Sequence, residues 1–192
     1  TDVVSGATFD AGTYDLSETG GPAGYTASAW VCVGGTQVDG DTVTIALGEN
    51  VTCTITNNDN ATTLTLVKTL VNDNGGTNII ADWALTADGN PFTSGVSQNV
   101  TPDTYTLTES GPSGYTASAW VCVGGSQTGS DITLALGENA TCTINNDDTS
   151  ATLTLQKTVV NDNGGSATNA NFTPSIDGSS TTWSTAINLN PG

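Results

Sequence analysis

A segment of twelve residues, GYTASAWVCVGG, occurs twice without change, at Gly24–Gly35 and at Gly114–Gly125. The shorter motifs LGEN, TCTI and VNDNGG each recur 89 residues apart. This period has the length of a domain, whereas solenoid units span about 20–50 residues. The sequence therefore predicts a tandem array in which 1–60 is the back part of one repeat, 61–148 a complete repeat and 149–192 the front part of the next.

Within each repeat, Thr and Val alternate with other residues in short runs, and Gly, Asn, Asp or Pro interrupts each run within a dozen positions. Alternation of this kind is typical of strands with one buried face, and closely spaced turns are typical of all-β sandwiches. No segment has a helical pattern. The prediction is an all-β chain of tandem immunoglobulin-like β-sandwich domains.

Acidic residues far outnumber basic ones, with 19 Asp and Glu against two Lys, and the net charge is −17. Nucleic acids and anionic membrane surfaces bind clustered Lys and Arg, so this charge argues against both as partners. No run of about 18 apolar residues is present, so no membrane insertion is expected.

The chain also has no histidine, which excludes Ser-His and Cys-His relays, and it has no phosphate loop or cofactor fingerprint. An enzyme acting on an external substrate is not expected.

Both lysines occupy the same place in the repeat: Lys68 in LTLVKT and Lys157 in LTLQKT. Side chains of one parity share a face of a strand, and both lysines share parity with leucines. A buried ammonium needs a carboxylate partner or a chemical purpose, because an isolated buried charge is costly. The alternative is a lysine that extends from the strand end to solvent and forms a surface ion pair.

The same parity rule places one glutamate and one asparagine on core-facing sides of strands, both in the N-terminal repeat and in the central repeat. Glu18 and Glu109 share a face with Tyr and Leu in YDLSE and YTLTE. Asn57 and Asn146 end the strand that carries the second cysteine. Lysine, glutamate and asparagine together can form an amide between side chains, because a neutral amine can attack the asparagine carbonyl while the carboxyl group moves protons.

These motifs resemble a known family. A first strand LTLVKT, a middle strand TYTLTES followed by GPSGY, and a last strand ending in TINN are similar to the Cna B-type or SpaA-like domains of bacterial surface proteins. The resemblance implies a prealbumin-like (transthyretin-like) sandwich over 61–148. It also implies an autocatalytic isopeptide bond between Lys68 and Asn146, with Glu109 as the catalytic residue.

When the resemblance is extended to the two flanking parts, each of them has only some of the three residues lysine, glutamate and asparagine. Glu18 and Asn57 lack a lysine, and Lys157 lacks its glutamate and asparagine. If separate chains complete one another by exchanging a strand, Lys157 of one copy could join Asn57 of the next. The expected partners are therefore neighbouring repeats of the same polypeptide or further copies of the same protein in a filament.

Four cysteines occur as one pair in each of two repeats, and repeat symmetry selects Cys32 with Cys53 and Cys122 with Cys142. Disulfides indicate an oxidising compartment, so the expected location is extracellular or on the cell surface. A zinc site is the weaker alternative, because neither CxxC nor histidine supplies further ligands. Isopeptide-forming members of the family do not usually carry a cysteine pair in every repeat. Either the disulfide or the isopeptide bond could therefore be the cross-link that stabilises this sandwich.

Two features leave alternatives open. The VNDNGG segments and the acidic linkers near Asp59, Asp147 and Asp148 could hold calcium, but Asn-Asp-Asn-Gly-Gly is also an ordinary turn sequence, and no cofactor is expected.

The mechanical interpretation of the array is a stalk or fibre repeat of a long bacterial surface protein. The alternative is an adhesin module that binds host glycan or protein, with Trp83 and Trp183 as candidate contacts.

Overall fold

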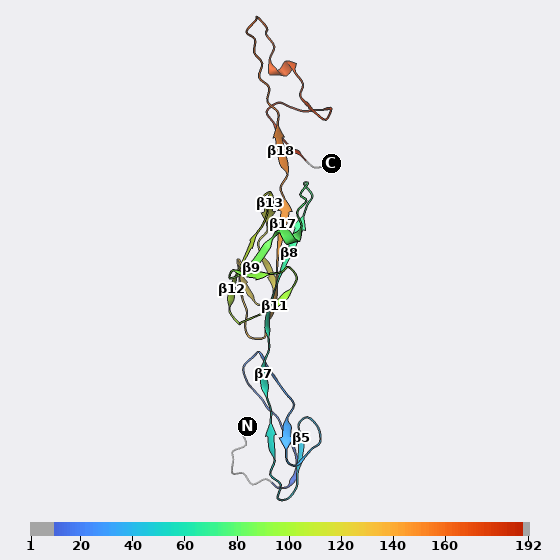
Figure 1. The fold of residues 1–192 in the computed structure, drawn as a ribbon, viewed down its shortest axis with the longest axis vertical. Coiled ribbons are helices and arrows are strands. Elements are labelled where there is room, and N and C mark those ends of the chain that lie inside the picture. Colours follow the sequence, from blue (N-terminus) through green and yellow to red (C-terminus); the bar gives the residue numbers. More distant parts are fainter. Residues whose placement is uncertain (1–9, 190–192) are drawn as a thin grey trace. The chain divides into compact units, whose positions relative to one another are not determined.

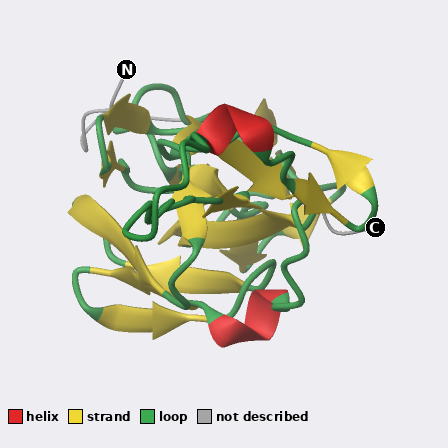
Figure 2. Cartoon of the chain, turned by 90° about the horizontal axis from the view of Figure 1, so that it is seen from above, coloured by secondary structure: helices red, strands yellow, loops and turns green. Residues whose placement is uncertain are grey.

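The computed structural model describes residues 10–189 (Figure 1). Apart from two 3-10 turns of three residues, η1 (Ile80–Asp82) and η2 (Asn169–Asn171), the regular elements are strands, shown in yellow in Figure 2. In this range no helix has the length and hydropathy needed to cross a membrane. The all-β prediction is confirmed, and the two short turns are the helical elements that the alternation pattern did not indicate.

The chain divides into two compact units. The first comprises the described part of Thr1–Leu64 together with Ser97–Tyr105 and Cys122–Thr141. Its strands pair in the orders β1-β5-β4, β2-β7, β3-β6 and β15-β16. They are β1 (Gly12–Asp15), β2 (Tyr25–Ala27), β3 (Val31–Val33), β4 (Thr36–Gln37), β5 (Thr42–Ile45), β6 (Thr52–Thr54), β7 (Asn57–Asp59), β11 (Ser97–Val100), β15 (Ser126–Thr128) and β16 (Asp131–Thr133).

The second unit comprises Thr65–Val96, Thr106–Val121 and the described part of Cys142–Gly192. Its shorter strands pair in the orders β10-β9, β18-β21 and β19-β20. They are β9 (Ala84–Ala87), β10 (Asn90–Phe92), β13 (Tyr115–Ala117), β18 (Ala151–Thr154), β19 (Ser175–Ile176), β20 (Ser179–Ser180) and β21 (Ala186–Leu189).

Four strands have residues in both units: β8 (Thr62–Val71), β12 (Thr104–Ser110), β14 (Val121–Val123) and β17 (Asn139–Asp148). One five-stranded sheet has the order β10-β9-β12-β16-β15. The other has the order β11-β8-β17-β13, with β14 also paired to β17. These sheets contain the residues expected for the complete repeat.

The neighbouring strands β8 and β17, both labelled in Figure 1, run parallel. Thr63 Oγ1 bonds Asn139 Oδ1 at 2.6 Å, and Thr69 Oγ1 bonds Asn145 Oδ1 at 2.9 Å. The sequence separation is 76 residues in both pairs. A constant separation is the mark of parallel strands, because in an antiparallel pair it would change along the strand.

Strand β8 alternates strictly between buried and less buried residues over its first seven positions, as a strand with one face on a core must. Its buried face ends in Lys68, which is 2% exposed. The apolar core residues are Val43, Leu64, Ile132, Leu134 and Ala140 in the first unit, and Leu66, Trp83, Leu85, Ala87, Phe92, Leu107, Trp120, Cys142 and Ile144 in the second.

Candidate functional site

Lys68 and Glu109 form an ion pair inside the second unit. Lys68 lies on β8 and Glu109 on β12, in the two different five-stranded sheets. Lys68 Nζ lies 3.0 Å from Glu109 Oε2, and the two side chains are 0% and 11% exposed. Burial of this pair removes almost all water from the ammonium and most of it from the carboxylate, so each depends on the other for charge compensation.

Asn146 is a further buried polar residue of the second unit. It lies on β17, next to β8 in the sheet, and is 5% exposed. Within residues 10–189, Lys68 Nζ, Glu109 Oε2 and Asn146 Oδ1 are the buried side-chain atoms without a hydrogen-bond partner. The ion pair at 3.0 Å therefore lacks the alignment of a hydrogen bond. Three unsatisfied polar atoms in one core are costly and call for an explanation.

The ring of Trp83 covers the lysine. Lys68 Nζ lies 5.2 Å from the centroid of Trp83, which is 7% exposed. The ring of Tyr115 meets Trp83 edge to face, with centroids 5.1 Å apart and an interplanar angle of 87°. Gly111 leaves space for this tryptophan, since a Cβ there would lie 2.3 Å from Trp83 Cδ1. This role of Trp83 was not predicted from the sequence, although its place before the alternating strand β9 was a usable signal.

The corresponding residues of the N-terminal repeat also meet, but in solvent. Asn57 Nδ2 donates to Glu18 Oε1 at 2.7 Å. The sequence pattern placed both side chains on inward faces, and the structure corrects this: both residues are exposed. The reason is that parity specifies a face, whereas burial requires a strand that covers it, and residues 10–59 contain no counterpart of β8. A cleft of about 400 Å³ lies here instead, lined by Glu18, Gly20, Gly21, Pro22, Tyr25, Ala27 and Asn57.

Lys157 of the C-terminal repeat has neither a carboxylate nor an asparagine like those of Lys68. Its Nζ lies 4.3 Å from the centroid of Phe172, and the residue is half-buried. Lys68–Glu109 is the ion pair found among the described residues, so Lys157 has no carboxylate partner there. Lys157 follows β18 rather than lying in it. Its predicted core face is therefore only partly covered.

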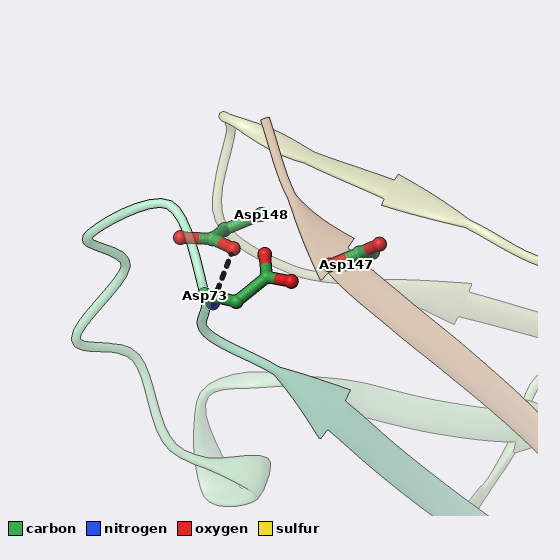
Figure 3. Close-up of side chains that lie close together, drawn as sticks. All are labelled: Asp73, Asp147 and Asp148. Atoms are coloured by element: carbon green, nitrogen blue, oxygen red, sulfur yellow. Dashed lines mark hydrogen bonds between the residues drawn. The ribbon is translucent and has the colours of Figure 1, made fainter. Parts of the chain in front are cut away.

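The loop after β8 is held by Asp148, at the end of β17 (Figure 3). Its carboxylate accepts backbone N–H bonds from Asp73 at 2.9 Å, Asn74 at 2.9 Å and Gly76 at 2.6 Å. Burial, the largest single influence, raises the pKa of Asp148, but these donors together outweigh it and hold the pKa below its ordinary value. Asp148 is therefore an anionic clamp on the loop.

Asp73, Asp147 and Asp148 bring carboxylate oxygens within 4.8 Å of one another (Figure 3). The oxygens of Asp148 already accept backbone hydrogen bonds, which suits the turn interpretation of this segment. Calcium binding at these carboxylates remains the untested alternative to the turn interpretation.

All four cysteines are oxidised. Cys32 pairs with Cys53 across the neighbouring strands β3 and β6. Cys122 and Cys142 are also disulfide-bonded, and because no cysteine is free, they are bonded to each other. A bridge that closes a loop of 21 residues stabilises a fold by about 3 kcal/mol in the chain-entropy model.

A family model of a prealbumin-like fold domain, the SpaA type, matches residues 1–55, 59–144 and 148–190. The chain belongs to this SpaA-type family of prealbumin-like domains. No curated protein and no solved structure matches the chain. Disulfide-bonded SpaA-type domains are typical of extracellular surface proteins.

Proposed function

We propose that this chain is a structural stalk or fibre segment of an extracellular bacterial surface protein, in which each complete repeat is stapled by a disulfide and by a Lys–Asn isopeptide bond. The observation that carries the proposal is the buried cluster of Lys68, Glu109 and Asn146 in a SpaA-type domain. All three groups have unsatisfied polar atoms in the core, and one reaction would satisfy the chemistry of all three.

The reaction is an amide exchange. A proton passes from Lys68 Nζ to Glu109 Oε2 across 3.0 Å, which leaves a neutral amine and a carboxylic acid. The amine attacks Asn146 Cγ, the Nζ–Cγ bond forms, and the Cγ–Nδ2 bond breaks. Glu109 relays protons from Nζ to Nδ2, which leaves as ammonia. The product has no net charge, so the cost of the buried ammonium disappears.

The surroundings of the cluster support this chemistry. Trp83, which packs against Tyr115, covers the lysine and limits access of water, which would otherwise stabilise the charged amine. The reaction occurs once within the fold, so the chain is not expected to turn over an external substrate. Its partners would be neighbouring repeats of the same polypeptide or copies of the same protein in a filament.

The adhesin alternative has weaker support. Trp83 is 7% exposed and offers almost no surface to a glycan or a protein. Trp183 is half-buried, and its Nε1 donates to Phe172 O at 2.8 Å. A mechanical role needs neither residue at a surface.

Intact mass of the fully reduced chain tests the proposal. The expected mass is lower than the sequence mass by one ammonia, and Glu109→Gln is expected to restore the full mass. The two lysines provide a matched control: Lys68→Ala abolishes the loss of ammonia, whereas Lys157→Ala leaves the bond of the central repeat intact. A wild-type chain of full sequence mass after prolonged incubation would contradict the isopeptide.

A further inference from the structure

The strands β3 and β14 carry the repeated sequence VCV and lie at sheet edges. Among the described residues, β3 pairs with β6 alone and β14 pairs with β17 alone. Cys32 and Cys53 face each other across β3 and β6 with Cα atoms 4.0 Å apart. This spacing is closer to the ~4.5 Å of a non-hydrogen-bonded pair than to the ~5.5 Å of a hydrogen-bonded one. The N–H and C=O groups of Cys32 therefore point away from β6, toward the free edge.

This free edge is occupied by a side chain of the same repeat. Gln37 lies on β4, and its Oε1 accepts the N–H of Cys32 at 3.1 Å. Its Nε2 donates to the C=O of Trp30 at 2.7 Å. A carboxamide has the donor and the acceptor of a peptide group, so it can make the bonds that a neighbouring strand would make. The side chain of Gln37 therefore takes the place of such a strand.

The central repeat has the same contact. Gln127 lies on β15, and its Oε1 accepts the N–H of Cys122 at 2.8 Å. Strand β15 ends the sheet β10-β9-β12-β16-β15, whereas β14 belongs to the other sheet of the complete repeat. Gln127 therefore joins the edges of the two sheets. Its recurrence in both repeats indicates that the contact belongs to the fold of the repeat.

Each carboxamide is also held by its own loop. Gln37 Nε2 donates to the C=O of Asp39 at 2.9 Å, and Gln127 Nε2 donates to the C=O of Gly129 at 2.8 Å. A carbonyl oxygen can only accept, so the amide nitrogen faces the loop and Oε1 faces the cysteine N–H. The orientation that covers the edge is therefore fixed within the repeat.

The covered strands are apolar and uncharged. Four valines on them are 62–76% exposed: Val31, Val33, Val121 and Val123. Residues 24–38 and 114–130 contain no charged side chain, although the chain carries a net charge of −17. An exposed apolar edge strand without charge readily pairs with another strand. Copies of an acidic chain repel each other least where neither carries charge, so the same strand of a second copy fits this edge best.

We propose that Gln37 and Gln127 are edge guards: each occupies the free edge of an apolar strand and prevents a second copy of this chain from adding its own β3 or β14 there. Without the carboxamide, the N–H of Cys122 is open to a new partner. Two β14 strands can then pair antiparallel about a two-fold axis, which gives a closed dimer. The inference goes beyond the stalk function and does not depend on the isopeptide bond.

Removal of one guard tests the proposal. Gln127→Met in the oxidised 192-residue chain removes both polar ends of the carboxamide and keeps the length of the side chain. Its self-association is expected to be at least about 10-fold tighter than that of wild type by sedimentation velocity, because the freed backbone groups gain partners on pairing. The expected species is a dimer. Gln37→Met/Gln127→Met has two open edges in each copy and is expected to form larger assemblies.

Two matched variants serve as controls. Gln156→Met adds the same apolar side chain at an exposed position outside the strands. Gln127→Glu keeps an acceptor for the N–H of Cys122 and places a charge at the edge, which discourages a second acidic copy. Both are expected to associate as wild type does. If Gln127→Met associates no more tightly than wild type or than Gln156→Met, the proposed guard is overturned.

Hydrogen exchange locates the association. The amide of Cys122 should exchange about 2- to 10-fold faster in dilute Gln127→Met than in wild type, and it should be protected again as the variant associates. Val121 is exposed beside the edge, so Val121→Asp in the Gln127→Met background should return association to the wild-type level. Association that leaves the Cys122 amide unprotected, or that persists with Val121→Asp, would overturn pairing at β14.

Discussion

Replacement of Glu109 by glutamine removes the charge that compensates Lys68 and keeps the shape of the side chain. Neither Glu109→Gln nor the double variant Lys68→Met/Glu109→Gln can form the amide, so a comparison of these two variants reports the effect of the unpaired ammonium. Glu109→Gln leaves an ammonium in a site where the lysine side chain is 0% exposed. The double variant Lys68→Met/Glu109→Gln leaves no charged group there.

The magnitude follows from the geometry. Two unit charges at 3.0 Å attract each other by about 5 kcal/mol at an effective dielectric constant of 20. Removal of one partner of a buried ion pair typically costs about 3–5 kcal/mol. We expect Glu109→Gln to be less stable than the double variant Lys68→Met/Glu109→Gln by about 3 kcal/mol, toward the lower limit, because the glutamine oxygen still faces the amine.

The assay is urea unfolding followed by tryptophan fluorescence, with intact mass measured on every sample. The reference is the double variant Lys68→Met/Glu109→Gln, which has no charged group at the site. A difference below about 1 kcal/mol between Glu109→Gln and this double variant would refute the reasoning, since the amine would then have access to water in the folded chain.

Three other outcomes are expected. The pKa of Asp148 is lowered in the folded chain, so its carboxylate stabilises the fold above the ordinary carboxyl pKa of 3.8, and this stability is lost as the pH falls through the folded pKa. Urea unfolding from neutral to acidic pH should show the loss in wild type and in the control Asp147→Asn. Asp148→Asn should not show it. Gly111→Ala should destabilise the fold by about 1–3 kcal/mol and shift tryptophan fluorescence to longer wavelength, because the new methyl group overlaps the indole of Trp83. Unchanged fluorescence would argue against this contact. Trypsin should cleave the native protein at Lys157 earlier than at Lys68, because only Lys68 is fully buried within a strand. Mass spectrometry of the early fragments gives the order of cleavage. Earlier cleavage at Lys68 would contradict its burial.

Local alternation correctly predicted which faces of the central strands are turned inward. Lys68, Glu109 and Asn146 lie on the faces that parity assigned to them, because a strand turns each successive side chain to the opposite side and this rule needs no tertiary information. The same rule failed for Glu18 and Asn57. It identifies a face, but it does not reveal whether another strand covers that face.

The parts of the site that the sequence did not reveal depend on contacts between distant segments. The packing of Trp83 against Lys68 and Tyr115 depends on how three separate segments meet. The clamp of Asp148 on the loop at 73–76 depends on a backbone conformation that exposes several N–H groups to one carboxylate. Neither feature has a period or a spacing that could be recognised along the chain.

The parallel arrangement of β8 and β17 has a mechanical consequence. In a chain without an amide between Lys68 and Asn146, a pull at Thr62, where β8 begins, and at Asp148, where β17 ends, would slide the two neighbouring strands past each other lengthwise. Their interstrand bonds would then be loaded simultaneously and in shear, whereas an antiparallel hairpin pulled at its open end loses its bonds one at a time. The middle repeat should therefore yield at higher tension than a hairpin with the same number of bonds.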